Sequence, residues 1–157
     1  MAELKEGKKA PEFTLESTDG EKISLKDYKG KKNVVLYFYP KDMTPGCTTE
    51  ACSFRDNLKR VEKYKAVIFG VSTDDVKSHQ KFTEKYKLNF PLLADVDKKV
   101  VKEYGVWQKK SLYGREFMGI VRSTFIIDKE GKIVKIFPKV KVNGHTDEVI
   151  EVLKGLK

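Results

Sequence analysis

The sequence predicts an α/β protein with a central mixed β-sheet flanked by helices. Two observations predict this class. Short apolar segments rich in β-branched and aromatic residues alternate with segments of helical periodicity, and two late strand-like segments are joined by a tight turn. Because no long linker or repeat interrupts the 157 residues, we expect a single domain over residues 1–157.

The first half of the chain contains two predicted strands and a helix. Lys22–Leu25 follows the turn signal Asp19-Gly20 and indicates a short, half-buried strand. Asn33–Tyr39 is rich in β-branched and aromatic residues, which is typical of a central strand covered on both faces. Between Cys47 and Tyr64 the apolar residues recur at helical spacing, which predicts one helix over this segment.

The alternation continues through the middle of the chain. Ala66–Ser72 predicts a second buried strand, and Asp74 and Asp75 can cap the helix that follows. Phe90–Ala94 predicts a third strand. The apolar face of the capped helix consists of Val76, His79, Phe82 and Tyr86. A short helix after the third strand carries Val100, Val101 and Tyr104.

The last part of the chain predicts a β-hairpin and a closing helix. Ser123–Asp128 and Lys132–Phe137 are strand-like and flank the turn Lys129–Gly131. The final amphipathic helix carries Val149, Ile150, Leu153 and Leu156. Strand and helix alternation followed by a hairpin and a helix is consistent with a thioredoxin-like core.

Composition excludes several classes of protein. No stretch approaches the roughly 20 apolar residues of a membrane span, so we expect no membrane partner. The first residues, Met1–Lys9, lack the apolar centre of a signal peptide, and we therefore expect a cytoplasmic location. In that compartment a cysteine pair is more often catalytic or redox-active than a structural crosslink.

The net charge of +9 raises the question of nucleic-acid binding. The lysines are scattered through every segment and alternate with acidic residues, as in Asp56–Tyr64, which favours a solvated surface with helical ion pairs. We therefore expect no specific nucleic-acid partner, although a basic surface can attract an acidic protein. A non-catalytic basic binding module stays the alternative from a different class.

Cys47 and Cys52 are the only cysteines, and their placement is the strongest functional indication in the chain. A loop containing Pro45 and Gly46 delivers Cys47 to the predicted start of a helix. Unpaired N–H groups and the helix dipole favour a thiolate there. Cys52, one turn further along, benefits less from the dipole, so Cys47 is the predicted nucleophile.

The spacing of the two cysteines predicts movement. Residues five apart in an ideal helix have Cα atoms about 8.7 Å apart, beyond the roughly 7 Å that a disulfide tolerates. A disulfide between Cys47 and Cys52 therefore requires the first turns of the helix to unwind.

Metal and cofactor sites are not expected. His79 and His145 are the only histidines, and neither lies at a metal-motif spacing from the cysteines. We interpret each histidine as a helix-surface or capping residue. The chain contains no glycine-rich phosphate loop and no Gly-x-Ser-x-Gly elbow.

The motif Pro40-x-x-x-Thr44-x-x-Cys47 resembles the active-site motif of peroxiredoxins. The longer segment Asp42–Cys52 resembles the bacterioferritin-comigratory-protein, or peroxiredoxin Q, branch of that family. The resemblance spans nearly the whole chain and includes Ala10–Phe13, Gly70–Ser72, Phe90–Asp95 and Arg122–Asp128.

The resemblance implies a role for each matching residue. Cys47 would be the peroxidatic cysteine, which attacks a peroxide oxygen and becomes a sulfenic acid. Arg122 would favour the thiolate and stabilise developing negative charge. Thr44 would hydrogen-bond the thiolate or the peroxide, Pro40 would shield the pocket from water, and Glu50 would orient the arginine.

Each of these positions also has a structural alternative. Arg122 could be a surface cation, and Thr44 could serve only as part of the helix N-cap. Glu50 could simply complement the helix dipole, and Pro40 could do no more than end the strand.

The resemblance further implies that Cys52 is the resolving cysteine. It would form an intramolecular disulfide with Cys47, and a thioredoxin-like dithiol protein would reduce it. Hydrogen peroxide and organic hydroperoxides are the implied substrates, with a monomer as the expected state and a dimer as the alternative. The rival enzyme class is a thiol–disulfide oxidoreductase, which normally has a Cys-x-x-Cys spacing and a proline where Ser123 stands.

Overall fold

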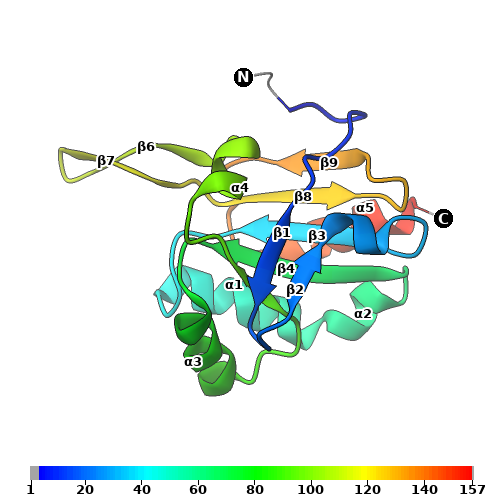
Figure 1. Ribbon diagram of the computed structural model, residues 1–157, viewed down its shortest axis with the longest axis horizontal. Coiled ribbons are helices and arrows are strands. Elements are labelled where there is room, and N and C mark those ends of the chain that lie inside the picture. The colour runs from blue at the N-terminus through cyan, green and yellow to red at the C-terminus, as the bar shows by residue number, and fades with distance from the viewer. Residues whose placement is uncertain (1–3, 157) are drawn as a thin grey trace.

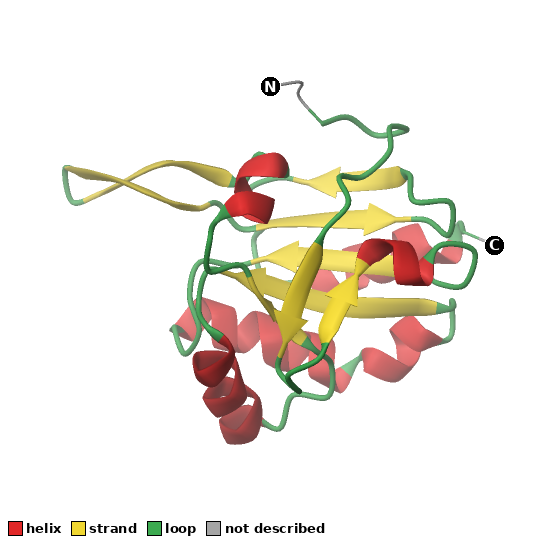
Figure 2. Ribbon diagram, viewed as in Figure 1, coloured by secondary structure: helices red, strands yellow, loops and turns green. Residues whose placement is uncertain are grey.

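The computed structural model describes residues 4–156 and contains a seven-stranded sheet with the order β2-β1-β5-β4-β3-β8-β9 (Figure 1). The central strand β3 (Asn33–Phe38) runs parallel to β4 (Ala66–Ser72) and antiparallel to β8 (Ser123–Ile127). Beyond them lie β5 (Leu92–Ala94), parallel to β4, and β9 (Ile133–Phe137), antiparallel to β8. The predicted α/β class with a mixed sheet is confirmed (Figure 2).

Both faces of β3 are buried, and each face has its own core. The side chains of Val35 and Tyr37 pack with residues of four helices, whereas Val34 and Leu36 face the opposite core, which contains residues of α4. The first core is covered by α1 (Pro45–Asp56), α2 (Leu58–Glu62), α3 (Val76–Tyr86) and α5 (His145–Lys154). The second core includes α4 (Lys99–Glu103), which lies in front of the sheet in Figure 1.

Three strands are absent from the sequence-based prediction. One is β1 (Thr14–Ser17), which pairs with β2 (Lys22–Ser24) and β5. The others, β6 (Trp107–Leu112) and β7 (Arg115–Ile120), form a separate ribbon that projects from the body (Figure 1). Most side chains of this ribbon are exposed, so it lacks the apolar alternation by which a half-buried strand is recognised.

The predicted single helix over Cys47–Tyr64 is wrong. The segment forms two helices, α1 and α2, which meet at Asn57 with a backbone φ of −114° and ψ of 11°. The Asn57 side-chain amide donates to the Ser53 carbonyl oxygen at 2.8 Å. Such local side-chain bonding to the backbone competes with helix continuation, which accounts for the break.

The interpretation of both histidines as helix-surface or capping residues is also wrong. His79 in α3 and His145 at the start of α5 are 0% and 2% exposed. Each ring nitrogen has a hydrogen-bond partner, which permits burial of a polar ring. Burial lowers the pKa of His145.

The remaining predicted elements are confirmed with small shifts of their ends. Asp75 caps α3 by accepting from the Ser78 backbone N–H at 2.8 Å. The strand predicted at Phe90–Ala94 begins only at Leu92. Within β4, Gly70 allows the Tyr37 ring to pack against the backbone, because a Cβ atom there would lie 2.7 Å from that ring.

Candidate active site

Cys47 lies in the first turn of α1, directly beyond the carboxyl end of β3. Thr44 is the N-cap residue, Pro45 takes the first helical position, and the first helical bond runs from the Thr48 N–H to the Thr44 carbonyl at 2.8 Å. The N–H groups of Gly46 and Cys47 therefore have no partner within the helix. The positive end of the helix dipole reaches the thiol at this position.

Arg122 brings a guanidinium group to the thiol from the neighbouring strand. It immediately precedes β8, whose Ser123 pairs with Phe38 at the end of β3. Its Nη2 donates to the Cys47 Sγ at 3.3 Å, and its Nη1 donates to Glu50 Oε1 at 2.6 Å. The antiparallel pairing of β3 and β8 thus joins residues that are 75 positions apart in sequence.

Cys47, Glu50 and Arg122 form a largely buried cluster of ionisable side chains. Cys47 is 1% exposed, and the side chains of Glu50 and Arg122 are 2% and 16% exposed. Burial raises the pKa of Glu50 to about 7, and the attraction of Arg122 only partly opposes this effect. Burial acts against the charge of Arg122, but Glu50 and Cys47 outweigh it and raise the pKa of Arg122.

Gly46 permits the close approach of Arg122. A Cβ atom at this position would lie 3.1 Å from Arg122 Nη2. The sequence indicates only that Gly46 belongs to a loop, because no local pattern shows that the Arg122 side chain lies beside it. The absence of a Cβ atom at residue 46 leaves room for the Arg122 guanidinium.

The remaining predicted site residues are Pro40, Thr44 and Cys52, which lie near Cys47 in the sequence and differ in their contacts. Pro40 is half-buried just after β3, and Thr44 donates its hydroxyl hydrogen to the Lys41 carbonyl oxygen at 2.9 Å. Thr44 makes no side-chain capping bond. Cys52 is half-buried within α1, and both thiols are free.

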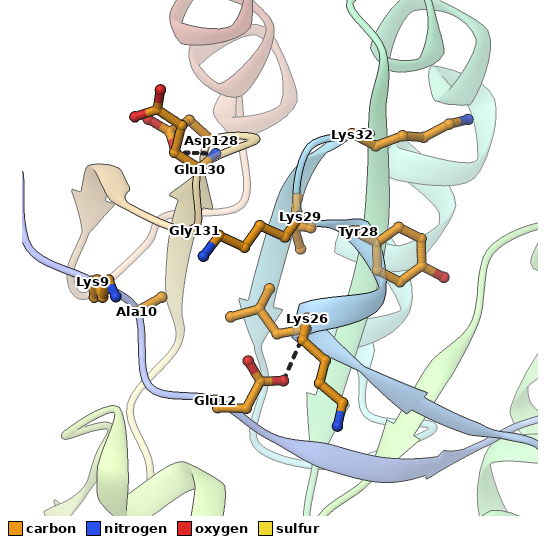
Figure 3. Close-up of a pocket in the computed structure, with 12 residues that line it drawn as sticks. Lys9, Ala10, Glu12, Lys26, Tyr28, Lys29, Lys32, Asp128, Glu130 and Gly131 are labelled. Carbon is orange, nitrogen blue, oxygen red and sulfur yellow. Dashed lines mark hydrogen bonds between the residues drawn. The ribbon is translucent and has the colours of Figure 1, made fainter.

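A cavity of about 280 Å³ lies on the other side of the sheet and is separate from Cys47. Its lining includes Val34, whose side chain faces the core opposite to that of Cys47. The lining lysines Lys26, Lys29 and Lys32 extend in different directions and do not converge (Figure 3). None of the residues that line this cavity is a cysteine.

No helix within residues 4–156 is both long and apolar enough to cross a membrane.

Comparisons with known proteins agree on one family. Residues 7–136 match the AhpC/TSA family. A putative peroxiredoxin bcp of Coxiella burnetii is 54% identical over 144 residues, covering 92% of this chain and 95% of the relative. Peroxiredoxin Bcp of Bacillus subtilis is 52% identical over 150 residues, covering 96% and 95%.

Solved structures give the same result. The bacterioferritin comigratory protein of Xanthomonas campestris is 42% identical with a TM-score of 0.86 over 90% of each chain. A mutant of PrxQ from Xylella fastidiosa is 37% identical with a TM-score of 0.91 over 98% of each chain. These neighbours confirm the thioredoxin-like fold and the predicted family. The chain therefore belongs to the AhpC/TSA family and, within it, to the Bcp/PrxQ peroxiredoxins, an enzyme family of thiol peroxidases.

Proposed function

We propose that this enzyme reduces peroxides through Cys47 as the peroxidatic nucleophile. The observation that carries the proposal is the hydrogen bond from Arg122 Nη2 to Cys47 Sγ at the first turn of α1. A fixed cation and a helix N-terminus at one sulfur both favour the thiolate. They also supply positive charge where negative charge develops during oxygen transfer.

The proposed first step is an in-line displacement on a peroxide oxygen. The Cys47 thiolate forms an S–O bond, the O–O bond breaks, and the departing alkoxide or hydroxide takes up a proton to leave as alcohol or water. Cys47 becomes a sulfenic acid, oxidised by the two electrons that reduce the peroxide.

The surrounding residues have positioning roles in this proposal. Thr44 uses its hydroxyl hydrogen on Lys41, which leaves its oxygen free to accept a hydrogen bond from the peroxide O–H. Glu50 holds the Arg122 guanidinium through its 2.6 Å bond. Pro40 has no N–H and offers the pocket an apolar wall.

Cys52 is the proposed resolving cysteine. Its thiol would attack the Cys47 sulfur, forming the disulfide and releasing water. Since both residues lie in α1, ideal helix geometry places their Cα atoms about 8.7 Å apart, too far for a disulfide. The first turns of α1 must therefore unwind once in each catalytic cycle.

The substrates, the reductant and the location complete the proposal. The Xanthomonas campestris relative is described in terms of alkyl peroxide reduction, which supports organic hydroperoxides as substrates beside hydrogen peroxide. A thioredoxin-like dithiol protein would reduce the disulfide by thiol exchange, and a monomeric enzyme of the cytoplasm would suffice for these steps.

Matched cysteine variants test the assignment. We expect Cys47→Ser to abolish peroxide consumption. Cys52→Ser should complete one turnover, fail to recycle with thioredoxin, and accumulate sulfinic acid at residue 47, since no thiol traps the sulfenic acid. Stopped-flow peroxide consumption and intact-mass analysis measure both outcomes. Steady-state peroxidase activity in Cys47→Ser would refute the proposal.

A further inference from the structure

A second polar cluster, partly buried, lies beside the active-site loop. It consists of Tyr39, Asp42, Asp74, Ser78 and His79, here called the loop clamp. The side chains of His79 and Asp42 are 0% and 1% exposed. None of the five has a hydrogen bond to Cys47, Glu50 or Arg122 among the described residues, so the peroxidase chemistry leaves this cluster unexplained.

The partners of His79 define how many hydrogens it shares. Its Nε2 lies 2.9 Å from the Leu93 carbonyl oxygen, which can only accept, so Nε2 carries a hydrogen. Its Nδ1 lies 2.7 Å from Asp42 Oδ2, and this contact requires a second hydrogen between the ring and the carboxyl group. The ring and the carboxyl group therefore share one hydrogen across this contact.

Both carboxyl oxygens and the backbone N–H of Asp42 form hydrogen bonds. Tyr39 donates its hydroxyl to Asp42 Oδ1 at 2.5 Å, and Ser78 donates to Oδ2 at 2.8 Å. The Asp42 backbone N–H donates to Asp74 Oδ2 at 2.8 Å. A residue of the active-site loop is thus bonded to α3, to the segment after β4 and, through His79, to β5.

Asp42, Asp74 and His79 also come close enough together to suggest a metal site. The geometry favours a clamp, because both His79 nitrogens, both Asp42 oxygens and Asp74 Oδ2 already have protein hydrogen-bond partners. An ion would have to displace several buried hydrogen bonds, each costly to break.

The loop that the clamp holds has a strained backbone. Met43, the residue after Asp42, has a φ of +67°, a left-handed conformation that side chains with a Cβ disfavour. Such strain persists only where surrounding contacts fix the chain. Met43 itself is 40% exposed, so the fixing contacts come from its neighbours.

We propose that Asp42 and His79 are positioning residues, whose buried pair fixes the strained loop so that Cys47 faces Arg122. This inference rests on the proposed role of Cys47. The clamp also limits the unwinding of α1: the chain stays anchored at Asp42 on one side and at Phe54, which is 0% exposed in α1, on the other. The segment free to unwind lies between them.

The test compares Asp42→Asn and His79→Gln with Val101→Ala. Val101 is fully buried in α4, packs in the opposite core, and serves as the control for lost stability alone. Two rates are measured for Cys47 in the reduced protein, oxidation by hydrogen peroxide and alkylation by iodoacetamide. Ser78→Ala, which removes one hydroxyl donor to Asp42, is the milder variant if either of the first two fails to fold.

We expect the ratio of the peroxide rate to the alkylation rate to fall about tenfold or more in the clamp variants. Oxygen transfer needs an oriented thiolate, whereas alkylation of a loosened loop does not. The double variant should be no worse than the poorer single variant, since the pair acts as one unit. Amide exchange at residues 41–47 should accelerate in these variants and not in Val101→Ala.

A rate ratio and amide exchange equal to those of Val101→Ala would overturn the clamp. The proposed function is judged separately, by whether the parent protein consumes peroxide at all. Amide exchange at residues 41–47 reports on the clamp in either case, because it does not depend on peroxidase activity.

Discussion

At the scale of single residues, the candidate site depends on one guanidinium group with two acceptors. Arg122 donates to Cys47 and to Glu50 through different nitrogens, so its orientation is fixed at both ends. Glu50 Oε2 is buried without a hydrogen-bond partner. Arg122 is therefore the group that favours the charged form of Glu50, against the effect of burial.

Gly46→Ala should separate activity from stability. Alanine favours a helix more than glycine does, so the free energy of unfolding should stay the same or rise. The new methyl group, 3.1 Å from Arg122 Nη2, should push the guanidinium from Cys47 and lower the rate of peroxide reduction about tenfold. Thr49→Ala, an exposed change in the same helix, is the control for both measurements.

Glu50→Gln should change the pH dependence of stability. Burial raises the folded-state pKa of Glu50 from 4.5 to about 7, so the folded protein binds more protons than the unfolded chain between these values. The stabilisation from Glu50 is complete below pH 4.5 and is lost as pH rises through 7.

The unfolding free energy of Glu50→Gln minus that of the parent should therefore rise by about 1–3 kcal/mol from pH 5 to pH 8. Urea denaturation at several pH values measures this difference. The exposed Glu84→Gln in α3 is the control, and parallel pH profiles for parent and Glu50→Gln would contradict the pKa shift.

At the scale of elements, the proposed mechanism requires α1 both to hold Cys47 in place and to unwind in its first turns. Its first part carries Cys47 and Cys52, whereas Phe54 packs against Tyr37 with ring centroids 4.8 Å apart. Ser53 and Thr146 in α5 are also joined by a hydrogen bond of 2.6 Å. The second part of α1 is thus fixed to the body, and α2 begins beyond the break at Asn57.

Oxidation should therefore expose the first turns of α1 without disturbing α2. We expect amide exchange at residues 46–52 to accelerate in the disulfide form, because those helical hydrogen bonds must open, while residues 58–62 keep their protection. Exchange measured by mass spectrometry on the reduced and oxidised forms provides the comparison. Equal protection of residues 46–54 in both forms would contradict the proposed unwinding.

At the scale of the whole molecule, the net charge of +9 concerns partners rather than the peroxide. Hydrogen peroxide is neutral, so long-range fields do not steer it. A protein reductant with an acidic surface would be attracted. Salt at about 0.1 M would screen that attraction at distances beyond about 10 Å.

Raising the salt concentration should therefore slow reduction of the disulfide by an acidic thioredoxin-like protein, by about tenfold between 10 mM and 500 mM salt. The rate of Cys47 oxidation by hydrogen peroxide should change little over the same range. Equal salt dependence of both rates would show that the basic surface does not recruit the reductant.

The sequence by itself determined the class of the fold, the main strands, the cysteine pair and the family motif, because periodicity and loop chemistry are local properties. The tertiary structure alone decided how Arg122 meets Cys47, that the Arg122 guanidinium lies beside Gly46, and where His79 lies. These contacts depend on strand pairing, as between β3 and β8, which joins distant residues that no local pattern relates. The ribbon β6–β7 and the break at Asn57 escaped prediction for a similar reason: their conformations depend on pairing and on side-chain hydrogen bonds, not on apolar periodicity.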